Sequence, residues 1–298
     1  MVRYVNRNDP GGHPAGYGCG EYMARKNKPV TIIVAAHKQY RMPDDSMYLP
    51  VHVGAEGKKA ADGSDLDLGY VKDNTGDNIS EKNPHYSELT GLYWAWKHIN
   101  SRYVGLVHYR RYFAGRRVSG DPFGRILLES ELRPMLRRYR VFVPRKRRYV
   151  IETLYSHYAH THYGTQLDET RNIIREKYPE YLETYDCVVR RTSGYMFNMM
   201  IMRRDLFREY CSWLFDILFE LEDRVDTSGL NFFQGRFYGR ISEIIFNVWL
   251  EQQLRTGRLR EDQIKELPFI YMEKIDWFKK GTSFLKAKFL HQKYESSF

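Results

Sequence analysis

Residues 103–107 read YVGLV, and the chain continues directly into HYRRYF at 108–113. The first five residues are apolar, with β-branched and aromatic side chains, which is typical of a strand buried in a parallel sheet. The next six are basic and aromatic. This change from a buried strand to a basic segment decides both the expected fold and the place to search for a site.

A second run of the same kind, VTIIVAA at 30–36, ends in His37 and Lys38. A third apolar strand is expected at 196–202. Helical periodicity separates these runs, because Leu89, Leu92, Tyr93 and Trp96 fall on one helical face behind a helix start at Asn83-Pro84. Further helices are expected at 129–138, 166–178, 205–225 and 242–254, and further strands at 48–53 and 140–143. Strands alternating with helices predict an α/β domain with a mostly parallel sheet flanked by helices.

Length and composition fit one large folded domain. The chain has 298 residues, 42% hydrophobic and 15% aromatic, which excludes a disordered chain. It holds no run of about 20 apolar residues and no secretory signal pattern. Three cysteines are too few for a disulfide framework and indicate a reducing, cytoplasmic compartment. We expect a flexible leader at 1–28, the folded domain at 29–272, and a basic amphipathic segment at 273–298.

The net charge of +10 is local. Residues 110–148 hold 13 Lys/Arg and 3 Asp/Glu, so 47 − 13 = 34 basic and 37 − 3 = 34 acidic residues remain elsewhere. One basic segment in a neutral body favours a site for a defined anion or an anionic surface. Arginines interleaved with aromatic residues also leave open a nucleic-acid-binding module.

Ligands of open parallel sheets bind outside the carboxyl ends of the strands. His37 and Lys38 follow one expected strand, and a second group follows another: His108, Tyr109, Arg110 and Arg111. Guanidinium groups bind phosphate oxygens in pairs, so this cluster predicts a diphosphate site. The alternative is a solvated basic turn.

Two acidic regions are further candidates. Asp73, Asp77 and Asn78 lie in a segment dense in turn-forming residues, suited to sugar hydroxyls or a nucleoside, or simply to an Asx turn that caps the next helix. Glu243 is expected at a helix start, where it is either a partner of the helix dipole or a catalytic base. Asp77 is the second candidate for that base.

Known catalytic and metal motifs are absent from the sequence. His157, His160 and His162 lack the companions of a metal site, although the first two are able to share a helical face. The chain has no phosphate-binding P-loop, GxGxxG, GxSxG or HExxH pattern. The usual support for a kinase, a dinucleotide oxidoreductase, an α/β-hydrolase or a zinc protease is therefore missing.

Several motifs in a fixed order resemble a known family. They are Met42-Pro43-Asp44-Asp45, residues 73–80, Lys82-Asn83-Pro84, Glu88-Leu89-Thr90, residues 93–97, residues 105–113, residues 195–202 and Ser242-Glu243. The combined pattern, over roughly residues 30–255, resembles the bacterial capsular and exopolysaccharide glycosyltransferases catalogued as domain of unknown function 4422.

The resemblance implies a GT-A-like fold and transfer of a sugar from a UDP-sugar donor, in some members galactofuranose, to a lipid-linked or oligosaccharide acceptor. It places Asn198 on the acceptor side. GT-A enzymes commonly hold a divalent metal with an Asp-x-Asp motif after a central strand, and here His108 to Arg111 occupy that place. We therefore expect no metal, with Asp44-Asp45 as the alternative acidic pair, and expect arginine charge to replace it.

The implied task also suggests a location. Lysines and aromatic residues at helical spacing in 276–294 predict peripheral binding to an anionic membrane at the cytoplasmic face, or else ordinary packing of a terminal helix. A noncatalytic scaffold for polysaccharide assembly is a further alternative to an enzyme.

Overall fold

The central sheet runs in the order β10-β6-β9-β4-β1-β2-β3 in a computed structural model that describes residues 28–273. Its strands are β1 (Val30–Ala36), β2 (Tyr48–His52), β3 (Val71–Lys72), β4 (Tyr103–His108), β5 (Arg111–Phe113), β6 (Val141–Pro144), β9 (Met200–Arg203), β10 (Ile264–Leu267) and β11 (Phe269–Tyr271). Strand β9 runs antiparallel to β4 and β6, and β5 pairs antiparallel with β4 and β11. The remaining pairings are parallel, which confirms the mostly parallel α/β sheet expected from the sequence.

Strands β1 and β4 form the middle of the core. Every residue of β1 is at most 1% exposed, because both faces of the sheet are covered. Burying one valine or isoleucine side chain contributes about 1.5–3 kcal/mol to the stability of the fold. The register pairs Ala35 with His108, so the two strands end side by side and deliver the segments that follow them to one edge.

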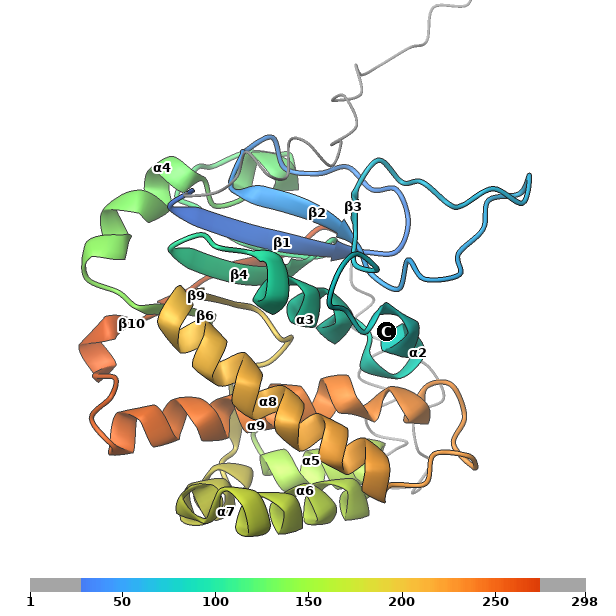
Figure 1. Cartoon of the computed structure of the whole chain (residues 1–298). Helices are drawn as coiled ribbons and strands as arrows, with labels where there is room; N and C mark the ends of the chain where they lie inside the picture. Colours follow the sequence, from blue (N-terminus) through green and yellow to red (C-terminus); the bar gives the residue numbers. More distant parts are fainter. Residues whose placement is uncertain (1–27, 274–298) are drawn as a thin grey trace, which may run out of the picture.

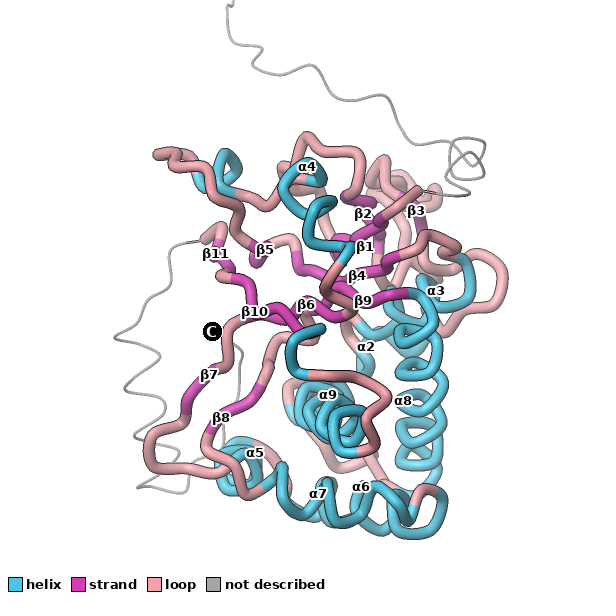
Figure 2. Tube along the Cα trace, turned by 90° about the vertical axis from the view of Figure 1, so that its left-hand side faces the viewer, coloured by secondary structure: helices cyan, strands magenta, loops and turns pink. Residues whose placement is uncertain are grey.

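Helices cover the sheet on both sides and build a second layer below it (Figure 1). They are α2 (Asn83–Tyr86), α3 (Leu89–His98), α4 (Glu129–Leu132), α5 (Leu154–Thr161), α6 (Gly164–Lys177), α7 (Leu182–Val189), α8 (Arg204–Arg224) and α9 (Phe237–Arg255). Helices α3 and α8 pack on one face of the sheet. On the other face, Tyr48 and Tyr103 donate hydrogen bonds to backbone carbonyls around α4. Helices α6 and α7 pack beneath α8 and α9. A separate two-stranded antiparallel sheet, β7 (Arg147–Arg148) with β8 (Ser193–Gly194), lies near α5 (Figure 2).

The helix expected to begin at Asn83 is broken in two. Its first part, α2, begins at Asn83 behind the capping residue Lys82. It ends at Tyr86, because the next residue, Ser87, has a φ of 55° in the left-handed region. The Asn83 side chain donates to the Ser87 carbonyl oxygen over 2.7 Å and holds this break. A new helix, α3, then begins behind Glu88. The interruption turns Glu88 toward the end of β4.

Two other expected boundaries were wrong. The strand expected over 196–202 begins only at Met200, because Phe197 and Asn198 have φ values of 77° and 53°. Helix α9 begins at Phe237, so Ser242 does not cap it. Ser242 lies inside the helix and is fully buried.

The expected leader and the basic C-terminal segment lie outside the described residues, apart from their innermost positions. In residues 28–273, none of the helices combines the length and apolar character that crossing a membrane requires.

Candidate active site

The carboxyl ends of β1 and β4 bring His37 and the segment His108–Arg111 together. The His37 ring lies 5.3 Å from the Tyr109 ring, edge to face, and Tyr40 stacks on Tyr109 with ring centroids 3.8 Å apart. Burial lowers the pKa of His37, and the nearby positive charges of Lys38, His108, Arg236 and Arg110 lower it further. The two strand ends that the sequence singled out therefore form one cluster, with Lys38 exposed at its margin.

Three arginines, Arg110, Arg111 and Arg236, give this edge a strong positive charge. The Arg111 guanidinium lies over the ring of Phe197 at 4.5 Å and near Tyr271 at 5.5 Å, and Arg110 lies 5.9 Å from the Tyr109 ring. Burial, and then the charge of Arg110, lower the pKa of Arg111.

Within residues 28–273, neither Arg110 nor Arg111 has a carboxylate at ion-pair distance, and the Nε of each is buried without a partner. An unsatisfied buried donor costs about 1–3 kcal/mol. The arrangement is therefore suited to an anion that supplies the missing acceptors.

Arg236, at the start of α9, completes the cluster. Its Nε donates to the Ser87 hydroxyl over 2.8 Å, which ties α9 to the break between α2 and α3. Burial lowers the pKa of Arg236, while the charge of Glu88 opposes that effect. The arginine is therefore held toward the same edge as Arg110.

Glu88 is a largely buried carboxylate that anchors the site. Its Oε2 lies 3.4 Å from His108 Nε2, and its Oε1 accepts a hydrogen bond of 2.8 Å from the Asn198 side-chain amide. Burial alone raises the pKa of Glu88, but the hydrogen bond and charge of His108 and the bond from Asn198 outweigh burial and hold it well below its usual value. Glu88 is therefore ionised, and it orients both His108 and Asn198.

Asn198 is held in a strained backbone conformation. It follows Phe197, and both residues adopt the left-handed region, which costs most non-glycine residues about 1–2 kcal/mol and costs Asn less. The strain places the Phe197 ring under Arg111 and sends the Asn198 amide to Glu88 and to the Gly239 carbonyl oxygen. Such strain persists at sites where the surrounding structure requires it, which is consistent with a functional role for this corner.

Glu243 lies in α9 and is the second buried carboxylate. Burial raises its pKa; Glu88 acts in the same direction, while Arg240, Arg111 and Arg147 act against it. The nearest of these cations is Arg240, whose Nη1 lies 3.6 Å from Glu243 Oε1. Two neighbouring carboxylates whose pKa values are pushed apart are typical of acid–base sites. Glu243, with the raised pKa, suits proton transfer, and Glu88 suits a fixed negative charge.

The structure does not bring Asp73, Asp77 and Asn78 into this cluster. The buried Asp73 carboxylate accepts hydrogen bonds from Gly54 and Ala55 backbone amides and from the hydroxyls of Ser80 and Thr90. It therefore holds the edge of the sheet together.

Asp77 pairs with Lys97 at 2.9 Å and accepts a hydrogen bond from Tyr93. Asn78 accepts from the Ser80 amide as an Asx turn, the alternative noted for this segment.

The residues present do not fit a divalent metal. The edge after β4 carries histidine and arginine, and residues 28–273 contain no group of three or more His, Cys, Asp or Glu side chains able to hold an ion. Asp45 sits at the opposite edge, before β2, where its two oxygens accept from the Met47 and Glu129 backbone amides. His157 and His160 do share a face of α5, but both Nδ1 atoms bond to the buried Glu152 at 2.7 Å.

The sequence was compared with models of known protein families and with curated proteins. Residues 31–254 match the sequence model of a family described as domain of unknown function 4422. The chain belongs to this family. No curated protein matches it.

Among solved structures, this member of the 4422 family is similar to the apo structure of WbbM, a bifunctional glycosyltransferase. The TM-score is 0.73 and the sequence identity 29%, over 83% of this chain and 46% of that one. The chain thus spans less than half the length of WbbM. The shared fold supports the GT-A-like α/β architecture inferred from the sequence.

Sequence reasoning missed three residues of the site as functional candidates: Glu88, Arg236 and Arg240. Glu88 stood inside the helix expected to begin at Asn83, where a charged residue is ordinary, and only the break at Ser87 gives it its position. Arg236 and Arg240 lie one turn apart at the start of α9, a start that was expected several residues later.

Proposed function

We propose that this chain is a glycosyltransferase, a UDP-sugar-dependent hexosyltransferase that acts in surface-polysaccharide synthesis. The observation that carries the proposal is the pair Arg110 and Arg111 at a strand end, with buried donors that no described residue satisfies. Membership of the 4422 family and the likeness to a bifunctional glycosyltransferase support it.

The arginine cluster binds the diphosphate of the donor. Arg110 and Arg111 reach it from the β4 end and Arg236 from α9. Charge-assisted bonds of this kind are roughly twice as strong as neutral ones. When the bond between the sugar and the diphosphate oxygen breaks, the electron pair stays on that oxygen, and preorganised guanidinium groups stabilise the charge that develops. His37 and His108 border the same space.

Glu243 acts as the general base. It takes the proton from the acceptor hydroxyl while that oxygen forms its bond to the anomeric carbon, so the reaction inverts the anomeric centre. A carboxylate with a raised pKa is better matched to this task near neutral pH. Asn198, held by Glu88, lies on the acceptor side. Galactofuranose is the first donor sugar to test, and the acceptor is a lipid-linked or oligosaccharide glycan at the cytoplasmic face of the membrane.

Transfer proceeds without a divalent metal in this proposal, since arginine charge takes the place that an acidic motif and its ion would occupy. No acidic pair stands at the end of β4, where such a motif would lie.

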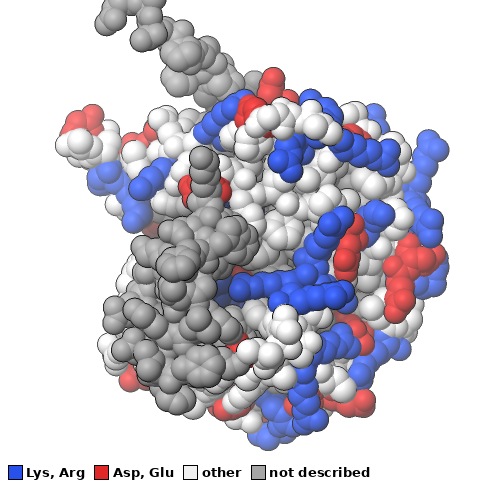
Figure 3. Space-filling view, turned by 180° about the vertical axis from the view of Figure 1, so that it is seen from behind, with Lys and Arg blue, Asp and Glu red and all other residues white. Residues whose placement is uncertain are grey.

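The nucleic-acid alternative loses its main argument in three dimensions. The basic residues of 110–148 separate: Arg111 lies among aromatic rings at the carboxyl edge, Arg133 pairs with Glu129, and Arg140 pairs with Asp205. On the rear face, basic side chains group near the centre and are elsewhere mixed with acidic ones (Figure 3).

The test is a UDP-release assay on the full chain with a panel of UDP-sugars and glycan acceptors in excess EDTA. We expect release with at least one donor, lost in Arg111→Lys, which keeps the charge but not the paired donors. Arg148→Lys on exposed β7 is the matched control and should keep full activity. Donor binding without any turnover would instead support a noncatalytic scaffold.

A further inference from the structure

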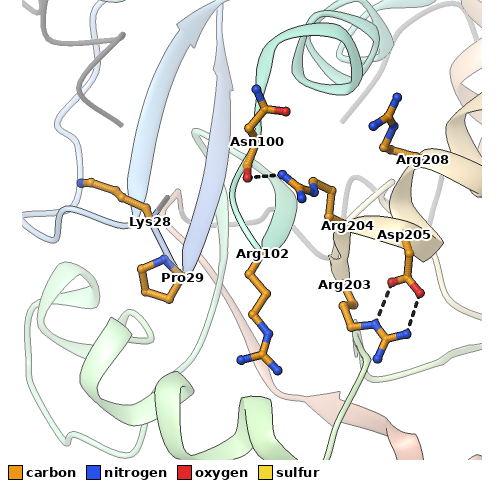
Figure 4. A pocket seen from close by; sticks show the side chains of 8 residues that line it. All are labelled: Lys28, Pro29, Asn100, Arg102, Arg203, Arg204, Asp205 and Arg208. Carbon is orange, nitrogen blue, oxygen red and sulfur yellow. Dashed lines mark hydrogen bonds and ion pairs between the residues drawn. The ribbon is translucent and has the colours of Figure 1, made fainter. Parts of the chain in front are cut away.

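A basic pocket lies at the opposite edge of the sheet, where β1 and β4 begin. It is lined by Lys28, Pro29, Asn100, Arg102, Arg203, Arg204, Asp205 and Arg208 (Figure 4). This edge faces the viewer in Figure 2. The seven residues of β1 separate it from His37 by roughly 20 Å at the usual rise per residue. The pocket is therefore distinct from the candidate active site.

Three of the lining arginines carry charge that the described residues do not neutralise. Arg203 makes a paired contact with Asp205, at 2.7 and 2.6 Å, and Arg140 and Arg258 also approach that carboxylate. In residues 28–273, by contrast, no carboxylate lies within ion-pair distance of the other three: Arg102, Arg204 and Arg208. The single acid of the pocket is thus already in use.

The fold holds these three charges beside one another. Arg204 and Arg208 are four residues apart in α8, so they lie on one face of the helix, where like charges repel. Arg204 reaches toward the carbonyl oxygen of Asn100 and donates a hydrogen bond to it. That bond joins α8 to the loop before β4, which carries Arg102. In Figure 4, Arg102 and Arg208 lie on opposite sides of Arg204.

We propose that this pocket binds a ligand bearing phosphate groups. Arginine forks match phosphate oxygens, and an anion there would relieve the repulsion among the three side chains. The volume of about 720 Å³ falls within the range of about 300–1,000 Å³ usual for small-molecule sites. The ligand is either a free phosphate compound or the phosphate headgroup of a lipid. This inference does not depend on the proposed function.

The test is hydrogen-exchange mass spectrometry of the full chain, which locates the bound ligand on the sequence. Inorganic pyrophosphate is the soluble probe, and vesicles of phosphatidic acid, compared with vesicles of phosphatidylcholine, are the lipid probe. We expect one of the two phosphate probes to slow exchange in peptides that cover 99–105 and 202–210. Protection by pyrophosphate indicates a soluble ligand, and protection by phosphatidic acid alone indicates a headgroup. Protection at 106–113 and 234–245 reports the candidate active site instead, so the two proposals fail separately.

A charge-neutralising pair of substitutions provides the control. The double variant Arg102→Gln, Arg208→Gln should need at least a tenfold higher probe concentration for the same protection from exchange. Arg175→Gln removes the positive charge of an exposed arginine in α6, and it should leave the required probe concentration unchanged. Neither exposed arginine packs in the core, so the double variant should fold. Absence of protection with both phosphate probes, or equal protection in the double variant, would overturn the proposal.

Discussion

Replacing Arg111 with methionine should separate ligand binding from stability. The Arg111 Nε is a buried donor without a partner among the described residues, at a cost of about 1–3 kcal/mol in the unliganded protein. Methionine removes that donor and the charge, and packs on the same Phe197 and Tyr271 rings. The lost cation–π contact is worth about 0.5–1 kcal/mol. The free energy of unfolding should therefore stay constant or rise by up to about 2.5 kcal/mol.

For a domain of this size, 1 kcal/mol corresponds to about 2–4 °C, so Tm should lie between the wild-type value and about 10 °C above it. Binding of UDP should move the other way. Hydrogen bonds to charged groups contribute about 1.5–3 kcal/mol, which predicts a Kd increase of about 10- to 150-fold. Differential scanning fluorimetry and isothermal titration calorimetry measure the two quantities. A variant with wild-type UDP affinity would refute the role of Arg111, and a lowered Tm would refute the claim that its burial is costly.

Three further predictions follow from the two carboxylates and the strained corner. Glu243→Gln should keep UDP affinity but lower turnover by about 10²-fold, the usual scale for a general base, and near-normal turnover in this variant would exclude Glu243 as the base. Because the pKa of Glu243 is raised, the turnover of the wild-type enzyme should fall with decreasing pH already above pH 4.5, the ordinary pKa of a glutamate. The lowered pKa of Glu88 stabilises the fold at pH above 4.5, and this contribution is lost as the pH falls. In urea unfolding, the free energy of unfolding of Glu88→Gln should therefore decrease less on acidification than that of the wild type. An unchanged pH dependence would count against the ionisation of Glu88. Asn198→Ala should destabilise the protein by about 2–4 kcal/mol, because it loses two hydrogen bonds and keeps the left-handed backbone. Asn198→Gly should recover about 1 kcal/mol of that loss, and equal stability of the two variants would show that this backbone conformation carries no strain.

The sequence identified the elements that depend on local pattern. Strand β1 was predicted at its observed boundaries, and α8 was predicted within one residue, because buried runs and long amphipathic faces are visible without tertiary information. The basic ends of β1 and β4 followed from the same pattern.

What the sequence could not supply depends on backbone conformation. The left-handed φ values of Ser87 and Phe197 belong to residue types that rarely adopt them, and a lone Asn such as Asn198 is a weak signal, so the sequence did not mark the helix break or the late start of β9. Glu88 occupies its position only through the first of these turns. Asp73 illustrates another limit, since composition does not reveal that four internal donors bind its carboxylate.

The central claim, that the arginine cluster recognises the diphosphate of a nucleotide donor, is tested most directly by calorimetric titration of the full chain with UDP, UMP and uridine in excess EDTA. The account predicts binding in the order UDP, UMP, uridine, with UDP at least tenfold tighter than uridine, since about 1.4 kcal/mol of phosphate contact suffices for that ratio. Equal affinity for uridine and UDP, or binding of UDP only after a divalent metal is restored, would contradict it.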